Sequence, residues 1–167
     1  MTVLLFVIAF VAMEAVAAVE HRWAMHGFAW SWHRSHHQVP GRRSLEPNDR
    51  FPLVFATAAF LGFLVGTQVD GWIWLVPVAT GVTAYGAVYA LIHEGYIHGR
   101  LGVRFPRVPA LDRLAEAHAL HHRFNGAPYG MLAPVVPAGI RARARHDATD
   151  ATDAPVRHGH AGASHQD

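Results

Sequence analysis

Three long apolar stretches dominate the hydropathy pattern of this chain of 167 residues. They cover Val3–Val19, Pro52–Val69 and Trp72–Ile92, and Glu14 is the only charged side chain inside them. Each stretch is close to the minimum length that crosses a bilayer core of roughly 30 Å. None carries the polar stripe at helical spacing that a helix of a soluble bundle shows. The pattern therefore predicts three membrane-spanning helices.

The connections between these stretches predict the topology. Only Asp70 and Gly71, a tight-turn signal, separate the second and third stretches, so we expect an antiparallel hairpin. With three crossings, residues 20–51 and everything from His93 onward lie on one side of the membrane. Every arginine also lies on that side, and the positive-inside rule makes it cytoplasmic, with Met1 outside. We expect a protein of the cytoplasmic membrane with a cytoplasmic C-terminus.

Two features inside the spans bear on helix geometry. Pro77 should kink the third span, because it cannot donate a backbone hydrogen bond. Gly62 and Gly66 either permit a close approach between helices or reflect the general abundance of glycine in membrane helices.

After His122 the chain changes character. Residues 131–140 are apolar, but too short and too rich in proline to span, which favours an interfacial or re-entrant segment. Residues 141–167 combine arginines, an Asp-Ala-Thr repeat and small residues, which is typical of a disordered tail. We therefore expect a membrane domain over residues 1–140, a tail over 141–167, and an all-α fold with additional helices at the cytoplasmic face.

Composition excludes several classes of protein. The chain has no cysteine, which rules out disulfides, thiolate-bound zinc, iron–sulfur clusters and a cysteine nucleophile. All of its 14 basic residues are arginine, so a Schiff-base lysine is impossible. The net charge is only +2, with no basic stripe, and we expect no binding to nucleic acid. The sequence leaves the oligomeric state open.

The candidate chemistry lies in four histidine clusters, all on the predicted cytoplasmic side. The ten histidines are His21, His26, His33, His36, His37, His93, His98, His118, His121 and His122. In the two His-x2-His-His clusters, positions i, i+3 and i+4 share one helical face. In the two His-x4-His pairs, positions i and i+5 lie about 140° apart on an ideal α-helix. These pairs need a helix end, a π-bulge or ligation of different metals.

Imidazole is the commonest side-chain metal ligand, and ten imidazoles divide naturally between two metal ions. An all-nitrogen site fits iron, copper, nickel or zinc and excludes calcium and magnesium. Glu94 and Glu116 are candidates for orienting a ligand imidazole, although each also fits a simple helix-end charge. All ten histidines are thus predicted metal ligands, with no further catalytic residue assigned.

The series of four clusters resembles the bacterial beta-carotene hydroxylases of the membrane fatty-acid hydroxylase and desaturase superfamily. The resemblance extends through Met13-Glu14, Met25-His26-Gly27, Asn48-Asp49 and residues 83–86. It covers nearly all of residues 10–122. Relatives usually carry aspartate at the position of Glu94, and this chain is shorter after His122.

The resemblance implies an enzyme, a non-haem di-iron monooxygenase, with the ten histidines as iron ligands and O2 as co-substrate. It would hydroxylate ring carbon 3 of beta-ionone rings, converting beta-carotene to zeaxanthin by way of beta-cryptoxanthin. Ferredoxin with its reductase would supply the electrons, and the carotenoid would enter from the bilayer.

Other functions are compatible with parts of the pattern. A lipid or sterol hydroxylase or desaturase, or a carotenoid ketolase, shares the histidine-rich site. A membrane metal transporter or metal-storage protein is less consistent, because transport requires ionisable residues within the spans and only Glu14 qualifies.

Overall fold

The computed structural model describes residues 1–38 and 45–153. Its helices are α1 (Thr2–Glu20), the π-helix η1 (His21–Phe28), α2 (Trp30–Gln38), the 3-10 helix η2 (Pro47–Asp49), α3 (Arg50–Gln68), α4 (Leu75–Ala90), the π-helix η3 (Leu91–Ile97), α5 (Pro109–Phe124) and α6 (Ala138–Asp153). These two described ranges contain no strand, so the predicted all-α class is confirmed.

Three continuous helical stretches are long and apolar enough to cross a membrane, as the hydropathy pattern predicts. They are Thr2–Phe28, Pro47–Gln68 and Leu75–Ile97. Large apolar side chains such as Leu4 and Leu53 are exposed on their surfaces. A continuous apolar surface of this kind is stable against lipid and unstable against water. The chain is therefore an integral membrane protein.

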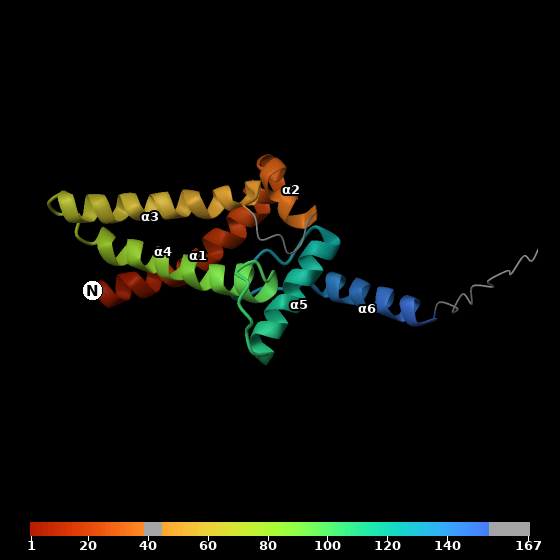
Figure 1. Ribbon diagram of the computed structural model, residues 1–167. Coiled ribbons are helices and arrows are strands. Elements are labelled where there is room, and N and C mark those ends of the chain that lie inside the picture. The colour runs from red at the N-terminus through yellow and green to blue at the C-terminus, as the bar shows by residue number, and fades with distance from the viewer. Residues whose placement is uncertain (39–44, 154–167) are drawn as a thin grey trace, which may run out of the picture.

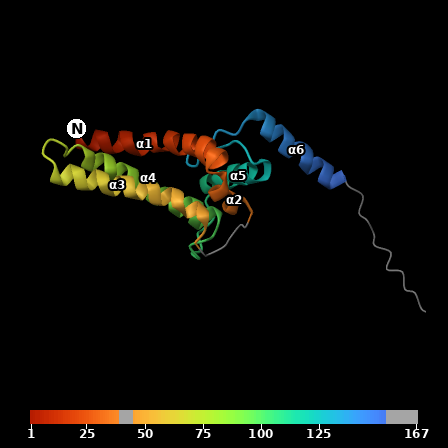
Figure 2. The same ribbon diagram turned by 90° about the horizontal axis from the view of Figure 1, so that it is seen from above.

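Helix α4 packs against both α1 and α3 (Figures 1 and 2). Glycines permit the close approach. A Cβ atom added at Gly66 would lie 3.0 Å from Val76 Cγ2, and one at Gly81 would lie 2.6 Å from the carbonyl oxygen of Phe6. Gly62 also faces α4. Of the two interpretations of the Gly62–Gly66 pair, the structure supports close helix approach.

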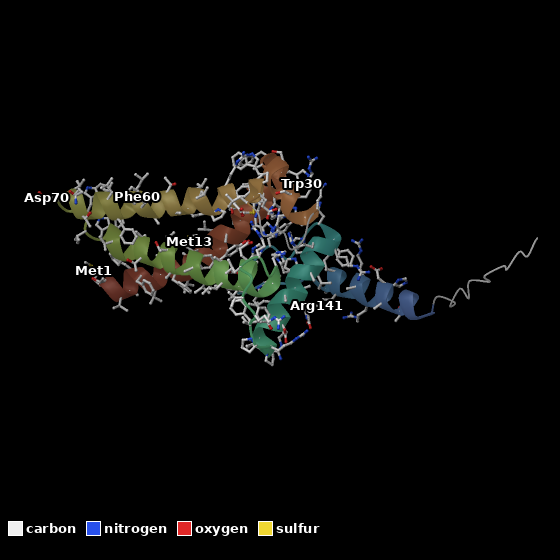
Figure 3. All side chains as sticks on the ribbon, viewed as in Figure 1. Met1, Met13, Trp30, Phe60, Asp70 and Arg141 are labelled. Carbon is white, nitrogen blue, oxygen red and sulfur yellow. The ribbon has the colours of Figure 1, made fainter. Side chains whose placement is uncertain are left out.

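The two ends of the bundle differ in content. Met1 and Asp70 lie at one end, and Trp30 lies at the other, where α2 and α5 gather (Figure 3). At the first end Gly71 has a φ of +82°, which suits the predicted tight turn between α3 and α4. All four histidine clusters are at the end of Trp30, as the predicted topology requires.

Two local predictions differ from the structure. Helix α4 begins at Leu75, so Pro77 lies in its first turn, where a missing N–H costs no hydrogen bond, and the helix continues to Ala90 without interruption. Disorder was expected from residue 141, but α6 is helical as far as Asp153. Its Arg and Ala content favours a helix, and Asp147 forms an ion pair of 2.7 Å with Arg123 of α5. Residues 154–167, the rest of the predicted tail, lie outside the described residues.

Candidate metal centre

Nine of the ten clustered histidines form two compact groups. The five-histidine group contains His21, His26, His33, His37 and His121, and the four-histidine group contains His36, His98, His118 and His122. Within each group the candidate ligand atoms all lie within 4.8 Å of one another. Side-chain nitrogens crowd the space between α2, α5 and the end of α4 (Figure 3). The tenth, His93, falls outside both groups, although its ring centroid lies 4.7 Å from that of His36.

Two π-helices explain how the His-x4-His pairs converge. In a π-helix the backbone N–H bonds to the carbonyl five residues earlier, so positions i and i+5 come to the same face. The amide of His98 accordingly donates to the carbonyl of His93 at 3.0 Å. In η1, the rings of His21 and His26 have centroids 5.1 Å apart. Of the three explanations left open by the sequence, the structure has the π-bulge.

The His-x2-His-His clusters of α2 and α5 are each shared between the two groups. On α2, His33 and His37 belong to the five-histidine group and His36 to the four-histidine group. On α5 the division is reversed, because His118 and His122 belong to the four-histidine group and His121 to the other. Positions i and i+4 thus serve one group, and position i+3 serves its neighbour. The two groups are adjacent, and the rings of His37 and His122 stack with centroids 4.3 Å apart.

Hydrogen bonds fix the tautomer of three histidines in the five-histidine group. The Nδ1 atom of His21 lies 3.0 Å from the carbonyl oxygen of Tyr129, that of His33 lies 2.7 Å from Asn48 Oδ1, and that of His121 lies 2.5 Å from the carbonyl oxygen of Gly126. A carbonyl oxygen only accepts, so each Nδ1 carries the proton and each Nε2 presents a lone pair. The Nε2 atoms of His21 and His33 are 3.1 Å apart. Two lone pairs that converge in this way repel each other unless a cation lies between them.

The spacing of these nitrogens suits a shared metal ion. Imidazole nitrogens about 2.1 Å from one ion, at right angles, are about 3 Å apart. The Nε2 atoms of His33 and His37 are separated by 3.1 Å, and those of His98 and His118 by 2.9 Å. In the four-histidine group, His36 Nε2 is buried and has no hydrogen-bond partner within the described part of the chain. Because an orphaned buried nitrogen is costly, both groups fit a metal ion.

Burial keeps these imidazoles neutral. Loss of hydration is the main cause, and neighbouring imidazoles add to it. Together they lower the pKa of His98 and His121 to about 3 and that of His33 and His122 to about 4. The pKa of His118 is also lowered, by burial first and then by His93. At neutral pH the lone pairs are therefore available for metal binding.

A layer of charged side chains surrounds the histidines. Glu94 Oε1 lies 2.6 Å from His93 Nδ1, and Glu94 Oε2 accepts from Arg100. Arg100 also forms an ion pair with Asp49 at 2.9 Å and with Glu46 at 3.3 Å. These contacts are consistent with the orienting role considered for Glu94. Glu116 is exposed on α5, which favours the simple surface charge.

Sequence reasoning did not identify the groups that hold the Nδ1 atoms. The pair Asn48-Asp49 fits a helix cap before Pro52 and forms part of the resemblance, but nothing local indicates that Asn48 Oδ1 accepts from His33. The Tyr129 carbonyl comes from a segment 108 residues after His21. A backbone acceptor leaves no signature in residue type, so only the fold discloses it.

An apolar cavity of about 550 Å³ adjoins the five-histidine group. It lies among α1, α3 and α4, with Phe55 and Phe63 in its walls. His21 and Glu94 line it as well, so the cavity extends from the membrane-spanning part to the histidines. Met131, from the segment before α6, completes the lining. Small-molecule pockets typically measure about 300–1,000 Å³, and this cavity is of that size.

The fold and the site define a class of integral membrane protein, in which histidines able to hold metal ions lie beside a cavity for an apolar molecule. The chain belongs to the fatty acid hydroxylase family, whose sequence profile matches residues 6–136. This finding confirms the family predicted from the histidine clusters.

Curated relatives cover most of the chain. It is 38% identical to the beta-carotene hydroxylase of Pseudescherichia vulneris over 159 residues, which cover 90% of this chain and 88% of that protein. It is 44% identical to the beta-carotene hydroxylase of a Paracoccus species over 132 residues, covering 75% and 78% respectively. The chloroplastic beta-carotene 3-hydroxylase 2 of Arabidopsis thaliana is 37% identical over 129 residues, covering 73% of this chain and 42% of the plant protein. No solved structure was found to match.

Proposed function

We propose that this protein is a carotenoid ring hydroxylase, an O2-dependent monooxygenase that hydroxylates carbon 3 of beta-ionone rings. Beta-carotene would be converted to zeaxanthin by way of beta-cryptoxanthin. The names of the bacterial relatives support the substrate, and that of the plant relative supports the position. The observation that carries the proposal is the contact between the apolar cavity and the five-histidine group. A ring entering from the bilayer would meet the histidines without crossing water.

The ten clustered histidines are the proposed ligands of two non-haem iron ions. The five-histidine group would hold one ion, and the four-histidine group, with the adjoining His93, would hold the other. Iron held there would supply the activation of O2 and the cleavage of the C–H bond. The chain supplies neutral imidazoles whose Nδ1 atoms are fixed by Tyr129, Asn48 and Gly126. Because these partners fix the tautomers, the Nε2 lone pairs are aligned before an ion binds.

The cavity would hold one ring of the carotenoid and the adjoining part of the polyene. Its aromatic and aliphatic walls exclude water from the reacting carbon and present the ring edge to the histidines. The second half of a molecule this long would remain in the bilayer. Hydroxylation of both rings then requires release and re-entry of the intermediate in the opposite orientation.

The reaction requires an external reductant. Inserting one oxygen atom of O2 into a C–H bond and releasing the other as water consumes two electrons and two protons. Ferredoxin with its reductase is the proposed donor. By the order of the spans along the sequence, every arginine falls on the histidine side, which supports a cytoplasmic location for the site and the C-terminus in the cytoplasmic membrane. A soluble cytoplasmic donor would then reach it directly.

Expression in bacterial cells that accumulate beta-carotene tests this function. We expect pigments heavier by one and then two oxygen atoms, with hydroxyl groups at carbon 3. His121→Ala should abolish them, because the side chain of His121 is fully buried in the five-histidine group. The matched control His146→Ala removes an exposed imidazole on α6, outside both groups, and should retain the products. Keto products would indicate a carotenoid ketolase instead. Unchanged beta-carotene together with an oxidised lipid would indicate a lipid hydroxylase.

A further inference from the structure

Glu14 lies in the first membrane span, and its carboxylate accepts hydrogen bonds from a distant part of the chain. The backbone amides of Met131, Leu132 and Ala133 donate to Oε1 at 2.8, 3.1 and 3.0 Å. Leu132 is also 3.1 Å from Oε2, and the Tyr85 hydroxyl donates to Oε2 at 2.7 Å. Three successive amides directed at one carboxylate form an anion-binding nest. A charge within a span is expensive, so this one has a dedicated set of partners.

The partners of Glu14 belong to a segment that also contacts the metal centre and the cavity. We call residues 129–133 the wall segment. At its start, the Tyr129 carbonyl accepts from His21 Nδ1 at 3.0 Å. Met131 is only 4% exposed and lines the cavity, as Tyr129 does. One short stretch therefore fixes a predicted metal ligand at one end and is bound to Glu14 at the other.

Gly130 shows how closely the wall segment approaches α1. A Cβ atom at this position would lie 2.8 Å from Glu14 Oε1 and 3.3 Å from the Ala133 carbonyl oxygen. Only glycine leaves room for the carboxylate inside the nest. Gly139, by comparison, has no atom within 4 Å of an added Cβ. The two glycines offer a matched pair of substitutions.

We propose that Glu14 is a positioning residue that holds the wall segment against α1 and α4 and thereby sets the fit of the substrate ring in the cavity. The substrate part of this inference rests on the proposed function. Glu14 does not belong to either histidine group. Its effect is transmitted through the backbone of residues 131–133 and through Tyr85, whose side chain also lines the cavity.

Loss of the carboxylate leaves the three amides without their acceptor, and that of the buried residue Met131 has little access to water. The wall segment then moves towards water or other acceptors, and the cavity loses one side. Glu14→Ala removes all these contacts. In Glu14→Gln, the remaining carbonyl oxygen can still accept from the three amides that bind Oε1. The NH2 group takes the place of Oε2, and because it is a donor it cannot accept from the Leu132 amide. The effect of glutamine should therefore lie between those of wild type and alanine.

Cysteine accessibility measures the position of the wall segment without any enzymatic reaction. The chain has no cysteine, so a single Met131→Cys reporter reacts with N-ethylmaleimide without background. In the iron-loaded protein in membrane vesicles, we expect slow labelling with Glu14. We expect labelling faster by at least roughly tenfold with Glu14→Ala, because the loss of a single hydrogen bond to a charged group already corresponds to that factor. Equal labelling rates in the two backgrounds would overturn the proposal.

Kinetics with beta-carotene in the same vesicles tests the effect on the substrate. Gly130→Ala and Glu14→Gln should raise KM by several-fold while kcat and iron content change far less, because Glu14 is bound to residues 131–133 and not to the Tyr129 carbonyl that accepts from His21. Gly139→Ala should match wild type. A fall in kcat with loss of iron and an unchanged KM would overturn the positioning role. If wild type leaves beta-carotene unmodified, the proposed function fails, whereas the labelling result still decides whether Glu14 holds the wall segment.

Discussion

Replacing Asn48 with leucine removes one hydrogen-bond acceptor and nearly preserves side-chain volume. Asn48 Oδ1 lies 2.7 Å from His33 Nδ1, and the two residues are 6% and 2% exposed. In the variant, His33 either keeps a buried N–H without a partner or turns its protonated nitrogen towards the other histidines. An unsatisfied buried donor costs about 1–3 kcal/mol. Loss of such an outer partner lowers metal affinity by roughly 10- to 100-fold, which is about 1.4–2.7 kcal/mol.

The expected defect is confined to one metal site. His33 belongs to the five-histidine group, so Asn48→Leu should weaken the ion there and leave the ion of the four-histidine group unchanged. Titration of the iron-loaded protein in detergent with a chelator of known affinity measures both sites. We expect one ion to leave at roughly 10- to 100-fold lower chelator concentration than in wild type.

Two variants serve as controls for this titration. Asn48→Asp retains an oxygen acceptor for His33 and should stay close to wild type. Gln68→Leu removes an exposed amide at the far end of α3 and should have no effect. If Asn48→Leu released both ions together, or neither, the assignment of His33 to a separate five-histidine site would be refuted.

Three further outcomes follow from the geometry. Gly81→Ala should destabilise the protein by about 1–3 kcal/mol, because the added Cβ would lie 2.6 Å from the Phe6 carbonyl oxygen. Gly86→Ala adds a Cβ with no neighbouring atom within 4 Å and should leave the stability unchanged, and unfolding in detergent distinguishes the two variants. The metal-free protein should lose stability as the pH falls from about 6.5 towards 4. Histidines of the unfolded chain bind protons near pH 6.5, whereas in the folded protein the pKa of His33 and His122 is lowered to about 4. Chemical unfolding measures this dependence, and a free energy of unfolding that does not change over this pH range would contradict it. Iron at 100 times its dissociation constant should add about 2.7 kcal/mol per independent site, and the melting temperature should therefore fall when a chelator removes it.

The sequence predicts the three spans well because the length and hydropathy of a span are local properties of the chain. The stretches Val3–Val19, Pro52–Val69 and Trp72–Ile92 correspond to the three helical spans, whose ends differ by one to five residues except that the first continues to Phe28. The common location of the four clusters follows from counting crossings. The same reasoning misplaced the effect of Pro77, because it began the third helix at Trp72 instead of Leu75.

The internal arrangement of the site could be predicted only in part. Spacing identified the ten histidines and left three explanations for the His-x4-His pairs, since a π-helix has no distinct sequence signature. It could not divide the clusters between two groups, because that depends on how α2 and α5 cross. The sequence shows Glu14 as a charge within a span and as part of the resemblance, but not its partners, because the three amides that bind it lie 117 to 119 residues away and the Tyr85 hydroxyl lies 71 residues away. Long-range contacts to backbone atoms are invisible in residue spacing.

The two histidine groups are proposed to form two separate iron sites. The most direct test is the number of iron ions per chain in the purified protein, measured by elemental analysis in wild type and in one variant of each group. We expect about two ions in wild type and about one in either His26→Ala or His98→Ala, because these residues belong to different groups. A single ion in wild type, zinc in place of iron, or loss of both ions in each variant would contradict it.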